Sequence, residues 1–243
     1  MNRQLLSLIT AAMVLIAAFA SCKKDKDGSG NSGGASVINA TVVDGDDYND
    51  EIATVTAWMY NYDHFNHDHF VVSGKYENGG FKLNLPKTVS ETYLYSFDEI
   101  YGFDDDEFEG TISDPKVKIN NMWIKAYNSQ EEGIGVFNWK NEDGNEACYV
   151  YADRNVTIKG RYGWYGNDHP DEYWIDEFDC SFTKGWNIMY TFYTSNDYKW
   201  LCITKKPSDV NYKWYYDDYS DGQKSPTDRQ HPLSKMRQCV SQK

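Results

Sequence analysis

Alternating apolar and polar residues recur in short runs along most of the chain after residue 36. Side chains alternate between the two faces of a strand, so this period of two predicts β-strands with one buried face. The runs cover residues 37–43, 52–60, 70–76, 81–85, 117–119, 122–127, 134–139, 148–152, 156–160, 178–182, 188–194, 200–204 and 213–216. Long apolar stripes with a helical period do not occur in this part of the sequence. The pattern therefore predicts an all-β protein.

Two turn signals support this prediction. Asn78-Gly79 lies between two of the apolar runs, and Asp143-Gly144 lies between two others. Asn-Gly and Asp-Gly favour the positive φ angles of a tight hairpin turn. The stretch Gly79-Gly80-Phe81-Lys82-Leu83-Asn84-Leu85-Pro86 resembles a strand of prealbumin-like or carboxypeptidase-regulatory-like sandwich domains, and this resemblance implies a β-sandwich in the first part of the chain.

The spacing of the strands sets the expected architecture. Many short strands separated by turn signals are typical of a β-sandwich or a β-barrel. Asp114-Pro115 marks a boundary between two sets of strands, so we expect two β-sandwich domains in tandem, over residues 36–113 and 114–216. Residues 217–243 show little periodicity, which predicts a polar, loosely ordered tail.

The first residues have the pattern of a bacterial export signal over residues 1–21. Arg3 is a positive n-region, residues 5–19 are almost wholly apolar, and Ala20-Ser21 are small residues before Cys22. The apolar run is shorter than the roughly 20 residues that a membrane span needs. A Cys directly after such a site resembles the lipobox of bacterial lipoproteins, which implies acyl chains on Cys22. An ordinary secretory signal with an incidental Cys22 is the alternative.

Residues 22–35 predict a flexible tether, because they are charged and then rich in Gly, Ser and Asn. The start Ser21-Cys22-Lys23-Lys24-Asp25 resembles lipoproteins of the Bacteroidetes, and residues 36–216 resemble small uncharacterised lipoproteins of that group. The second resemblance is carried by Val42-Val43-Asp44-Gly45-Asp46-Asp47-Tyr48-Asn49, Tyr76-Glu77-Asn78-Gly79-Gly80-Phe81, Tyr149-Val150-Tyr151-Ala152-Asp153-Arg154, Lys184-Gly185-Trp186-Asn187 and Lys213-Trp214-Tyr215-Tyr216. The resemblance implies an outer-membrane lipoprotein facing the cell exterior, with the periplasmic face as the alternative, and it implies no activity.

Charge narrows the classes of partner. The chain has 37 acidic and 24 basic residues, a net charge of −13, which would repel nucleic acids. Aromatic residues make up 16% of the chain, and these residues suit a pleated, half-buried surface. Composition therefore supports the all-β prediction and excludes nucleic acid as a partner.

Four cysteines follow Cys22, at Cys148, Cys180, Cys202 and Cys239. The first three alternate with apolar or aromatic neighbours in predicted strands, so we interpret them as reduced thiols of the core. An exported protein can also form disulfides, and four cysteines allow three connectivities. Cys239 lies in the polar tail and is a poor candidate for a structural role.

No cofactor is expected, but a group of histidines and two clusters of acidic residues are candidate metal ligands. His64, His67 and His69 lie within one polar loop, and neutral imidazoles are favoured ligands of Zn²⁺ or Cu²⁺. Two acidic clusters offer oxygen ligands for Ca²⁺. These clusters are Asp44, Asp46, Asp47 and Asp50, and Asp104, Asp105, Asp106, Glu107 and Glu109. None of these groups matches a known spacing of metal ligands, and solvated loops are the competing interpretation.

The stretch 161–174 is expected to be a long loop rich in aromatic residues. Rings can stack on the C–H faces of sugars while carboxylates and amides bind the hydroxyls, so the stretch predicts a glycan-binding site. The candidate residues are Trp164, Tyr165, Asp168, Tyr173 and Trp174. The competing interpretation is that these rings fold back and cap the end of the sandwich.

Catalysis has little support in the sequence. No nucleophile elbow, phosphate-binding loop or metalloprotease motif occurs. The pairs Asp171-Glu172 and Asp176-Glu177 are adjacent, so on a strand their side chains point to opposite faces and cannot flank one bond. We therefore expect a lipid-anchored, non-catalytic binding or adhesion module with a glycan as the first candidate ligand. A structural envelope protein that contacts other surface proteins is the alternative, and a metal-binding module is third.

Overall fold

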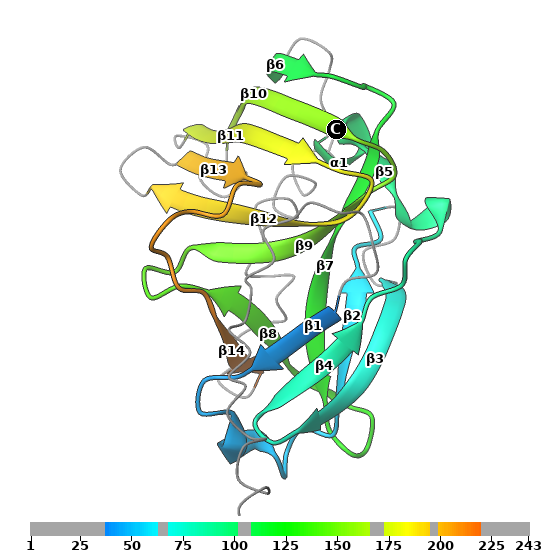
Figure 1. Cartoon of the computed structure of the whole chain (residues 1–243), viewed down its shortest axis with the longest axis vertical. Helices are drawn as coiled ribbons and strands as arrows, with labels where there is room; N and C mark the ends of the chain where they lie inside the picture. The colour runs from blue at the N-terminus through cyan, green and yellow to red at the C-terminus, as the bar shows by residue number, and fades with distance from the viewer. Residues whose placement is uncertain (1–36, 63–67, 102–107, 166–172, 195–198, 220–243) are drawn as a thin grey trace, which may run out of the picture. The chain divides into compact units, whose positions relative to one another are not determined.

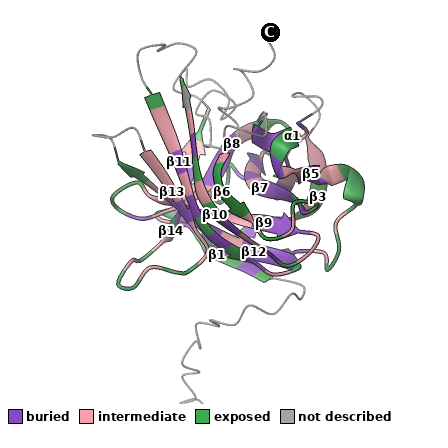
Figure 2. Ribbon diagram, turned by 90° about the horizontal axis from the view of Figure 1, so that it is seen from above, coloured by how far each residue is buried: buried purple, intermediate pink, exposed green. Residues whose placement is uncertain are grey.

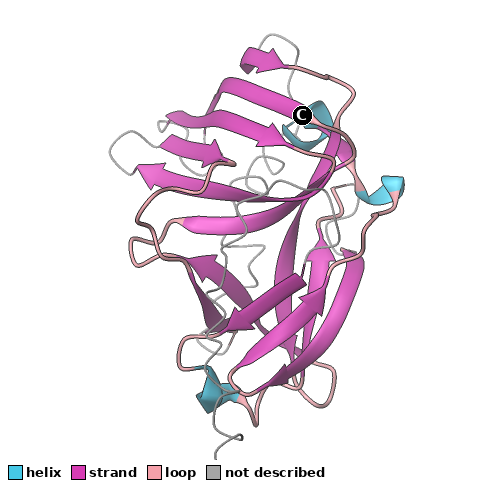
Figure 3. Ribbon diagram, viewed as in Figure 1, coloured by secondary structure: helices cyan, strands magenta, loops and turns pink. Residues whose placement is uncertain are grey.

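β-Strands make up most of the described chain (Figure 3). The structure is a computed structural model, and it describes residues 37–62, 68–101, 108–165, 173–194 and 199–219. These residues all lie in the second of two units into which the chain divides, Ser32–Lys243. The export signal, Cys22 and the tether are outside the described residues. No helix in the described ranges is long and apolar enough to cross a bilayer.

The strands belong to one extended sheet (Figure 1). They are β1 (Val37–Thr41), β2 (Thr54–Met59), β3 (His69–Glu77), β4 (Gly80–Asn84), β5 (Tyr95–Ser96), β6 (Phe108–Ile112), β7 (Lys118–Tyr127), β8 (Gly133–Lys140), β9 (Glu146–Ala152), β10 (Val156–Tyr165), β11 (Tyr173–Phe182), β12 (Gly185–Thr194), β13 (Lys199–Ile203) and β14 (Lys213–Asp218). Their order is β1-β4-β3-β2-β7-β8-β9-β12-β13-β11-β10-β6, with β14 paired to β8 and β5 paired to β7. The helical elements are η1 (Gly45–Tyr48), η2 (Glu91–Tyr93) and α1 (Phe97–Tyr101).

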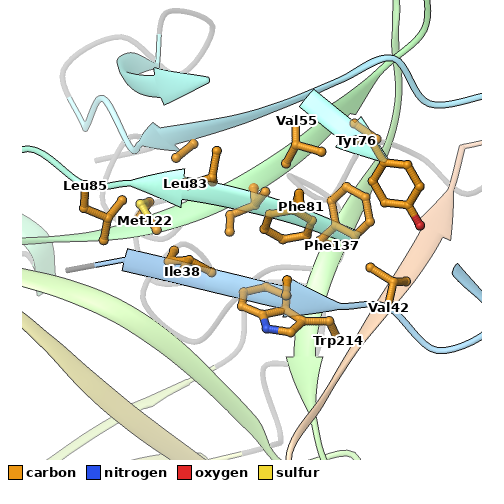
Figure 4. Close-up of a cluster of buried hydrophobic side chains, with 14 of the residues drawn as sticks. Ile38, Val42, Val55, Tyr76, Phe81, Leu83, Leu85, Met122, Phe137 and Trp214 are labelled. Carbon is orange, nitrogen blue, oxygen red and sulfur yellow. The ribbon is translucent and has the colours of Figure 1, made fainter. Parts of the chain in front are cut away.

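One part of the sheet closes on itself. β14 pairs with β8, and Val42, just after β1, forms a parallel bridge to Trp214 in β14. The strands β1, β4, β3, β2, β7, β8 and β14 thus form a ring around a first core. Figure 4 shows Phe81, Phe137 and Trp214 together in this core, and Phe81 contacts both other rings. The bridge at Val42 thus joins the β1 end of the sheet to β14.

The remaining strands extend the sheet and enclose a second core. Helix α1 lies against this part, where Ile100 and Tyr101 pack with Ile158, Cys180 and other buried residues. β9 and β12 lie between the two cores, and much of each strand is buried on both faces, although β12 ends in exposed residues (Figure 2). Their side chains alternate accordingly, so Tyr151 and Trp186 belong to the first core while Val150 and Met189 belong to the second.

The all-β prediction is confirmed, but two tandem sandwiches are not. β2 and β7 lie on either side of the expected boundary at Asp114-Pro115, yet they pair antiparallel from Thr54↔Tyr127 to Met59↔Met122. The alternating pattern identifies strands but says nothing about their partners. The long-range pairing of β2 with β7 therefore could not be read from the sequence.

The structure confirms one predicted turn and corrects the bounds of the predicted loop and tail. The hairpin turn at Asn78-Gly79 is confirmed, with φ angles of 53° and 68°. The expected loop 161–174 is wrong at both ends, because β10 continues to Tyr165 and β11 begins at Tyr173. The expected tail begins too early, since β14 includes Asp217 and Asp218. Helix α1 was missed because five residues are too few to show a helical period.

Candidate functional site

Tyr165, the last residue of β10, and Tyr173, the first residue of β11, form an exposed aromatic pair. They are direct partners in the antiparallel ladder, so their side chains share one face of the sheet. Their ring centroids are 4.9 Å apart with planes tilted by 58°. Tyr165 is 63% exposed and Tyr173 is 47% exposed. We call these two residues the open pair. The interpretation that these rings fold back to cap a sandwich is not supported for Tyr165 or Tyr173.

Gly163 determines how the Tyr173 ring lies. A Cβ atom built on Gly163 would collide with the Tyr173 hydroxyl oxygen and the ring carbons next to it. Only glycine therefore lets the ring lie against the β10 backbone at this point. The hydroxyl end of the Tyr173 ring therefore lies over Gly163, while the ring contacts Tyr165 and the residue remains 47% exposed. Sequence reasoning missed this role, although a glycine inside a strand signals close approach by another group.

The charged groups on the same face neutralise one another. The Arg161 guanidinium lies 2.6 Å from a Glu109 oxygen, and Lys159 lies 3.1 Å from Asp179. Lys199 in β13 also pairs with Glu177 in β11. Glu109 raises the pKa of Arg161, and Tyr173 contributes in the same direction. The open pair therefore lies beside paired, solvated charges.

Trp174 points to the opposite face from Tyr173. Its ring stacks on Tyr193 of β12 at 6.0 Å, and Tyr193 contacts Trp200 of β13 at 4.7 Å. The predicted site residues thus do not share one surface. The backbone of Trp164 pairs with Trp174, but its side chain is outside the description, as is the whole of Asp168. Tyr193 and Trp200 were missed because they reach the site by pairing between strands.

A buried carboxyl group lies next to these rings. Asp176 is 1% exposed and is the ladder partner of Trp200 on one side and of Tyr162 on the other. Burial raises the pKa of Tyr101 well above its ordinary value, and its electrostatic interactions with nearby Cys202 and Asp176 raise it further. Glu177 points to the other face and pairs with Lys199. The two adjacent carboxyls are therefore separated by the sheet, as the alternation predicts.

A second aromatic cluster lies on β2 and β7, and it is covered by the protein itself. Trp58 and Trp123 are ladder partners, and Lys125 Nζ lies 3.8 Å from the Trp123 ring and 5.8 Å from the Trp58 ring. Tyr60 stacks on Trp123 at 5.7 Å, and Asp68 pairs with Lys125 at 3.7 Å. We call these five residues the covered cluster. Sequence reasoning did not identify it as a cluster.

Burial shifts both charged groups of the covered cluster. It raises the pKa of the Asp68 carboxyl, which Lys125 only partly opposes, and it lowers the pKa of Lys125. Loss of water thus disfavours the charged forms of both Asp68 and Lys125, and the interaction between the two side chains favours them. The protein's own Lys125 supplies the cation of the covered cluster. Together with Tyr60, it already occupies the ring of Trp123.

The histidine hypothesis rests largely on residues outside the described chain, His64 and His67. His69 is described, and its ring stacks on Tyr93 at 4.1 Å while Nε2 lies 3.3 Å from the Tyr95 hydroxyl. His69 is therefore engaged in packing.

Two of the proposed calcium ligands, Asp46 and Glu109, also interact with other side chains of the protein. Around η1, Asp46 accepts a hydrogen bond from Asn49, whose own side-chain oxygen accepts from the Gly79 N–H. Glu109 of the second cluster binds Arg161, and its other members, Asp104, Asp105, Asp106 and Glu107, lie outside the described residues. Among the described residues, no group of His, Cys, Asp or Glu side chains is placed to hold a metal ion.

The cysteine prediction is confirmed for three residues. Cys148, Cys180 and Cys202 are free thiols, and the latter two are fully buried. Burial raises the pKa of Cys180 to about 12 and that of Cys202 well above its ordinary value. The thiols therefore stay protonated and unreactive at neutral pH. Cys239 lies outside the described residues.

The geometry thus offers one solvent-facing aromatic pair on a rigid strand end and a further aromatic group on the opposite face. Rings of this kind can bind apolar or C–H-rich surfaces, and the paired charges nearby leave hydrogen-bonding groups at the rim. No family model matches the chain, and no curated protein or solved structure shows significant similarity to it.

Proposed function

We propose that this protein is a non-catalytic carbohydrate-binding protein of the bacterial cell envelope, held at the outer membrane by acylated Cys22. The observation that carries the proposal is the open pair, above all the Tyr173 ring that Gly163 allows to lie on the strand. A ring fixed in this way loses little side-chain entropy when a ligand stacks on it.

The chemistry of the open pair suits a sugar. A pyranose has a C–H face that packs on an aromatic ring, and its hydroxyls need partners at the rim. Tyr165 and Tyr173 provide two neighbouring rings with hydroxyl groups, and Arg161 and Glu109 stand on the same face. A partner with an extended apolar surface would remove water from these polar groups without replacing its hydrogen bonds, at a cost in affinity.

The affinity of one such platform is expected to be low. At about 0.3 kcal/mol per non-hydrogen atom, a single sugar ring contributes on the order of 3 kcal/mol, which is a millimolar or weaker interaction. Linked sites raise the apparent affinity by a factor of about 100 or more. A lipid anchor on Cys22 with a flexible tether would place many copies on one surface. Several weak sites would then bind one polysaccharide together.

Affinity electrophoresis of the full-length protein in detergent tests the proposal. Native gels containing soluble starch, xylan, galactomannan or mixed-linkage β-glucan are compared with gels without polysaccharide. We expect retardation in at least one gel, and its loss in Tyr173→Ala. Phe70→Ala is the matched control, because Phe70 is an exposed ring, at 51%, on a different part of the sheet. Absence of retardation in every gel, or equal loss in both variants, contradicts the proposal.

A further inference from the structure

Strand β6 (Phe108–Ile112) is the last strand in the order of the sheet, and among the described strands it pairs with β10 alone (Figure 1). At the other end of that order, β1 is tied to β14, because the Val43 N–H donates to the Trp214 carbonyl oxygen at 2.9 Å. The three central residues of β6, which include Gly110, are exposed. A glycine has only backbone atoms, so solvent reaches the backbone of β6. We call the side of β6 that points away from β10 the β6 edge.

The hydrogen bonds between β6 and β10 direct every second residue of β6 toward this edge. Ser113, which follows β6, donates its N–H to the Thr157 carbonyl oxygen at 2.9 Å, and the register from there along β6 is continuous. Hydrogen-bonded and non-hydrogen-bonded pairs alternate along an antiparallel ladder. The N–H and C=O groups of Gly110 and Ile112 therefore point away from β10, where an added strand can bind them.

The β6 edge lacks the features that usually block the addition of a strand. Edge strands are commonly protected by Lys, by Pro or by a bulge. The sequence of β6 contains no Lys or Pro, and its ladder with β10 shows no shift of register. The one charged residue of β6, Glu109, is already paired with Arg161. The β6 edge thus combines exposed backbone with a neutralised charge.

The sequence of β6 is complementary to a second copy of itself. In antiparallel pairing centred on Gly110, Phe108 lies opposite Ile112 of the second copy, and Glu109 lies opposite Thr111. Phe108 and Ile112 both pack on the second core, so this register brings apolar side chains together on one face. Glu109 faces a hydroxyl group, whereas two directly opposed carboxylates would be destabilising. A slip of one residue would move the apolar side chains of one copy to the other face.

Charge also favours contact between two copies at this edge. The chain carries a net charge of −13, so two copies repel one another overall. Beside the β6 edge, however, Arg161 is paired with Glu109 and Lys159 is paired with Asp179. Two copies can therefore approach one another here with little repulsion.

We infer that two copies of this protein associate by antiparallel pairing of their β6 strands, which makes one continuous sheet across the dimer. The strand is short, so the dimer is weak in dilute solution and is favoured where the proposed lipid anchor concentrates copies on one membrane. Opposed residues of paired strands point to the same face. The two open pairs then lie on one face of the continuous sheet and bind a polysaccharide together, a consequence that rests on the proposed function.

Cysteine cross-linking tests both the pairing and its register. Gly110 is unsuitable for substitution, because a Cβ atom there would collide with the Lys159 carbonyl oxygen. Two full-length variants, Glu109→Cys and Thr111→Cys, are made in a Cys239→Ser background, mixed in detergent and oxidised with copper phenanthroline. In the proposed register, the Cα atoms of residues 109 and 111 of different copies are about 4.5 Å apart, which a disulfide can span. Cysteines at the same position in both copies are diagonal neighbours, roughly 7–8 Å apart.

We expect the mixture to form disulfide dimers at least about tenfold faster than either variant alone, because only the mixture places two thiols opposite one another. The matched control is the mixture of Asn39→Cys with Thr41→Cys, since these exposed residues have the same spacing on β1 at the other end of the sheet order. The control mixture should show no such preference. Each variant is checked for an unchanged melting temperature. Equal rates in the β6 mixture and in its single variants, or no cross-linking, overturn the inference.

Hydrogen exchange of the wild type tests the dimer without any substitution. The N–H groups of Gly110 and Ile112 should exchange quickly in the monomer and more slowly as the protein concentration rises, because pairing protects them. Mass spectrometry of the peptide that contains β6 measures this exchange in detergent. Exchange that does not depend on concentration overturns the inference. Neither experiment uses a polysaccharide, so their failure leaves the proposed function intact.

Discussion

The covered cluster and the open pair are both aromatic, but the protein treats their ring faces differently. Trp58 and Trp123 are approached by the chain's own cation, Lys125, which Asp68 neutralises. The hydroxyl end of Tyr173 lies over Gly163, and Arg161 on the same face is paired with Glu109. Aromatic density alone therefore does not mark a binding surface. What distinguishes the open pair is exposure: Tyr165 and Tyr173 are 63% and 47% exposed, whereas Trp123 in the covered cluster is contacted by both Tyr60 and Lys125.

The covered cluster should contribute mainly to stability, and the open pair mainly to binding. A desolvated cation–π contact is worth about 2 kcal/mol, so the covered cluster should stabilise the fold. Exposed side chains contribute little to stability, so the open pair should matter for binding instead.

The largest expected effect is the loss of a ring from the covered cluster. Trp123→Ala removes the partner of both Tyr60 and Lys125, and we expect a decrease of about 3 kcal/mol in the free energy of unfolding. Tyr173→Ala should lower it by about 0.5 kcal/mol or less. Denaturant unfolding of both variants measures the two values. Equal losses would mean that the two clusters do not differ in the way described.

The next effect concerns the charge in the covered cluster. Lys125→Met leaves the Asp68 carboxylate partly buried without its cation, so we expect a loss of about 2 kcal/mol at neutral pH. A carboxyl with a raised folded-state pKa contributes stability below its unfolded pKa, and this contribution is lost as pH rises through the folded pKa. Removing Lys125 raises the pKa of Asp68 further.

The deficit of Lys125→Met should therefore shrink as pH falls through the pKa of Asp68 in that variant. Unfolding by denaturant at a series of pH values measures this dependence. Adding Asp68→Asn should restore most of the lost stability at neutral pH, because it removes the unpaired charge. A pH-independent deficit that the second substitution does not restore would show that the pair has no electrostatic role.

A further effect appears only at alkaline pH. Burial raises the pKa of both Tyr76 and Tyr149 from 10.0 to about 12. The stability that these raised pKa values contribute is fully present below pH 10 and is lost as pH rises through about 12. We expect their phenolate absorbance to appear together with the loss of the β-sheet circular dichroism signal. Ionisation of these tyrosines near pH 10 in a folded protein would disprove their burial.

Sequence reasoning was reliable where the cause of a feature is local. The turn at Asn78-Gly79 follows from residues that accept positive φ, and Leu83 and Leu85 share a buried face because of simple alternation. The buried thiols of Cys180 and Cys202 follow from the same alternation. These features depend on only a few consecutive residues.

It failed where partners are distant in the chain. The pairing of β2 with β7 joins the two expected domains, and the parallel pairing of β11 with β13 brings Trp200 next to Asp176. Neither pairing leaves a signal in the alternating pattern. The candidate site was therefore found in part: Tyr165 and Tyr173 were identified, whereas Tyr193 and Trp200 required the topology.

The proposed function requires the Tyr173 ring, whose hydroxyl end lies over Gly163, to act as a binding surface. Gly163→Ala tests it most directly, because the added methyl group displaces the ring while both tyrosines remain. Gly133→Ala is the matched control, since a Cβ there meets only Tyr127 at an ordinary 3.7 Å. Affinity electrophoresis on the polysaccharide that retards the wild type should show binding lost in Gly163→Ala and kept in Gly133→Ala, with both variants folded. Wild-type retardation of Gly163→Ala would show that the Tyr173 ring is not the binding surface.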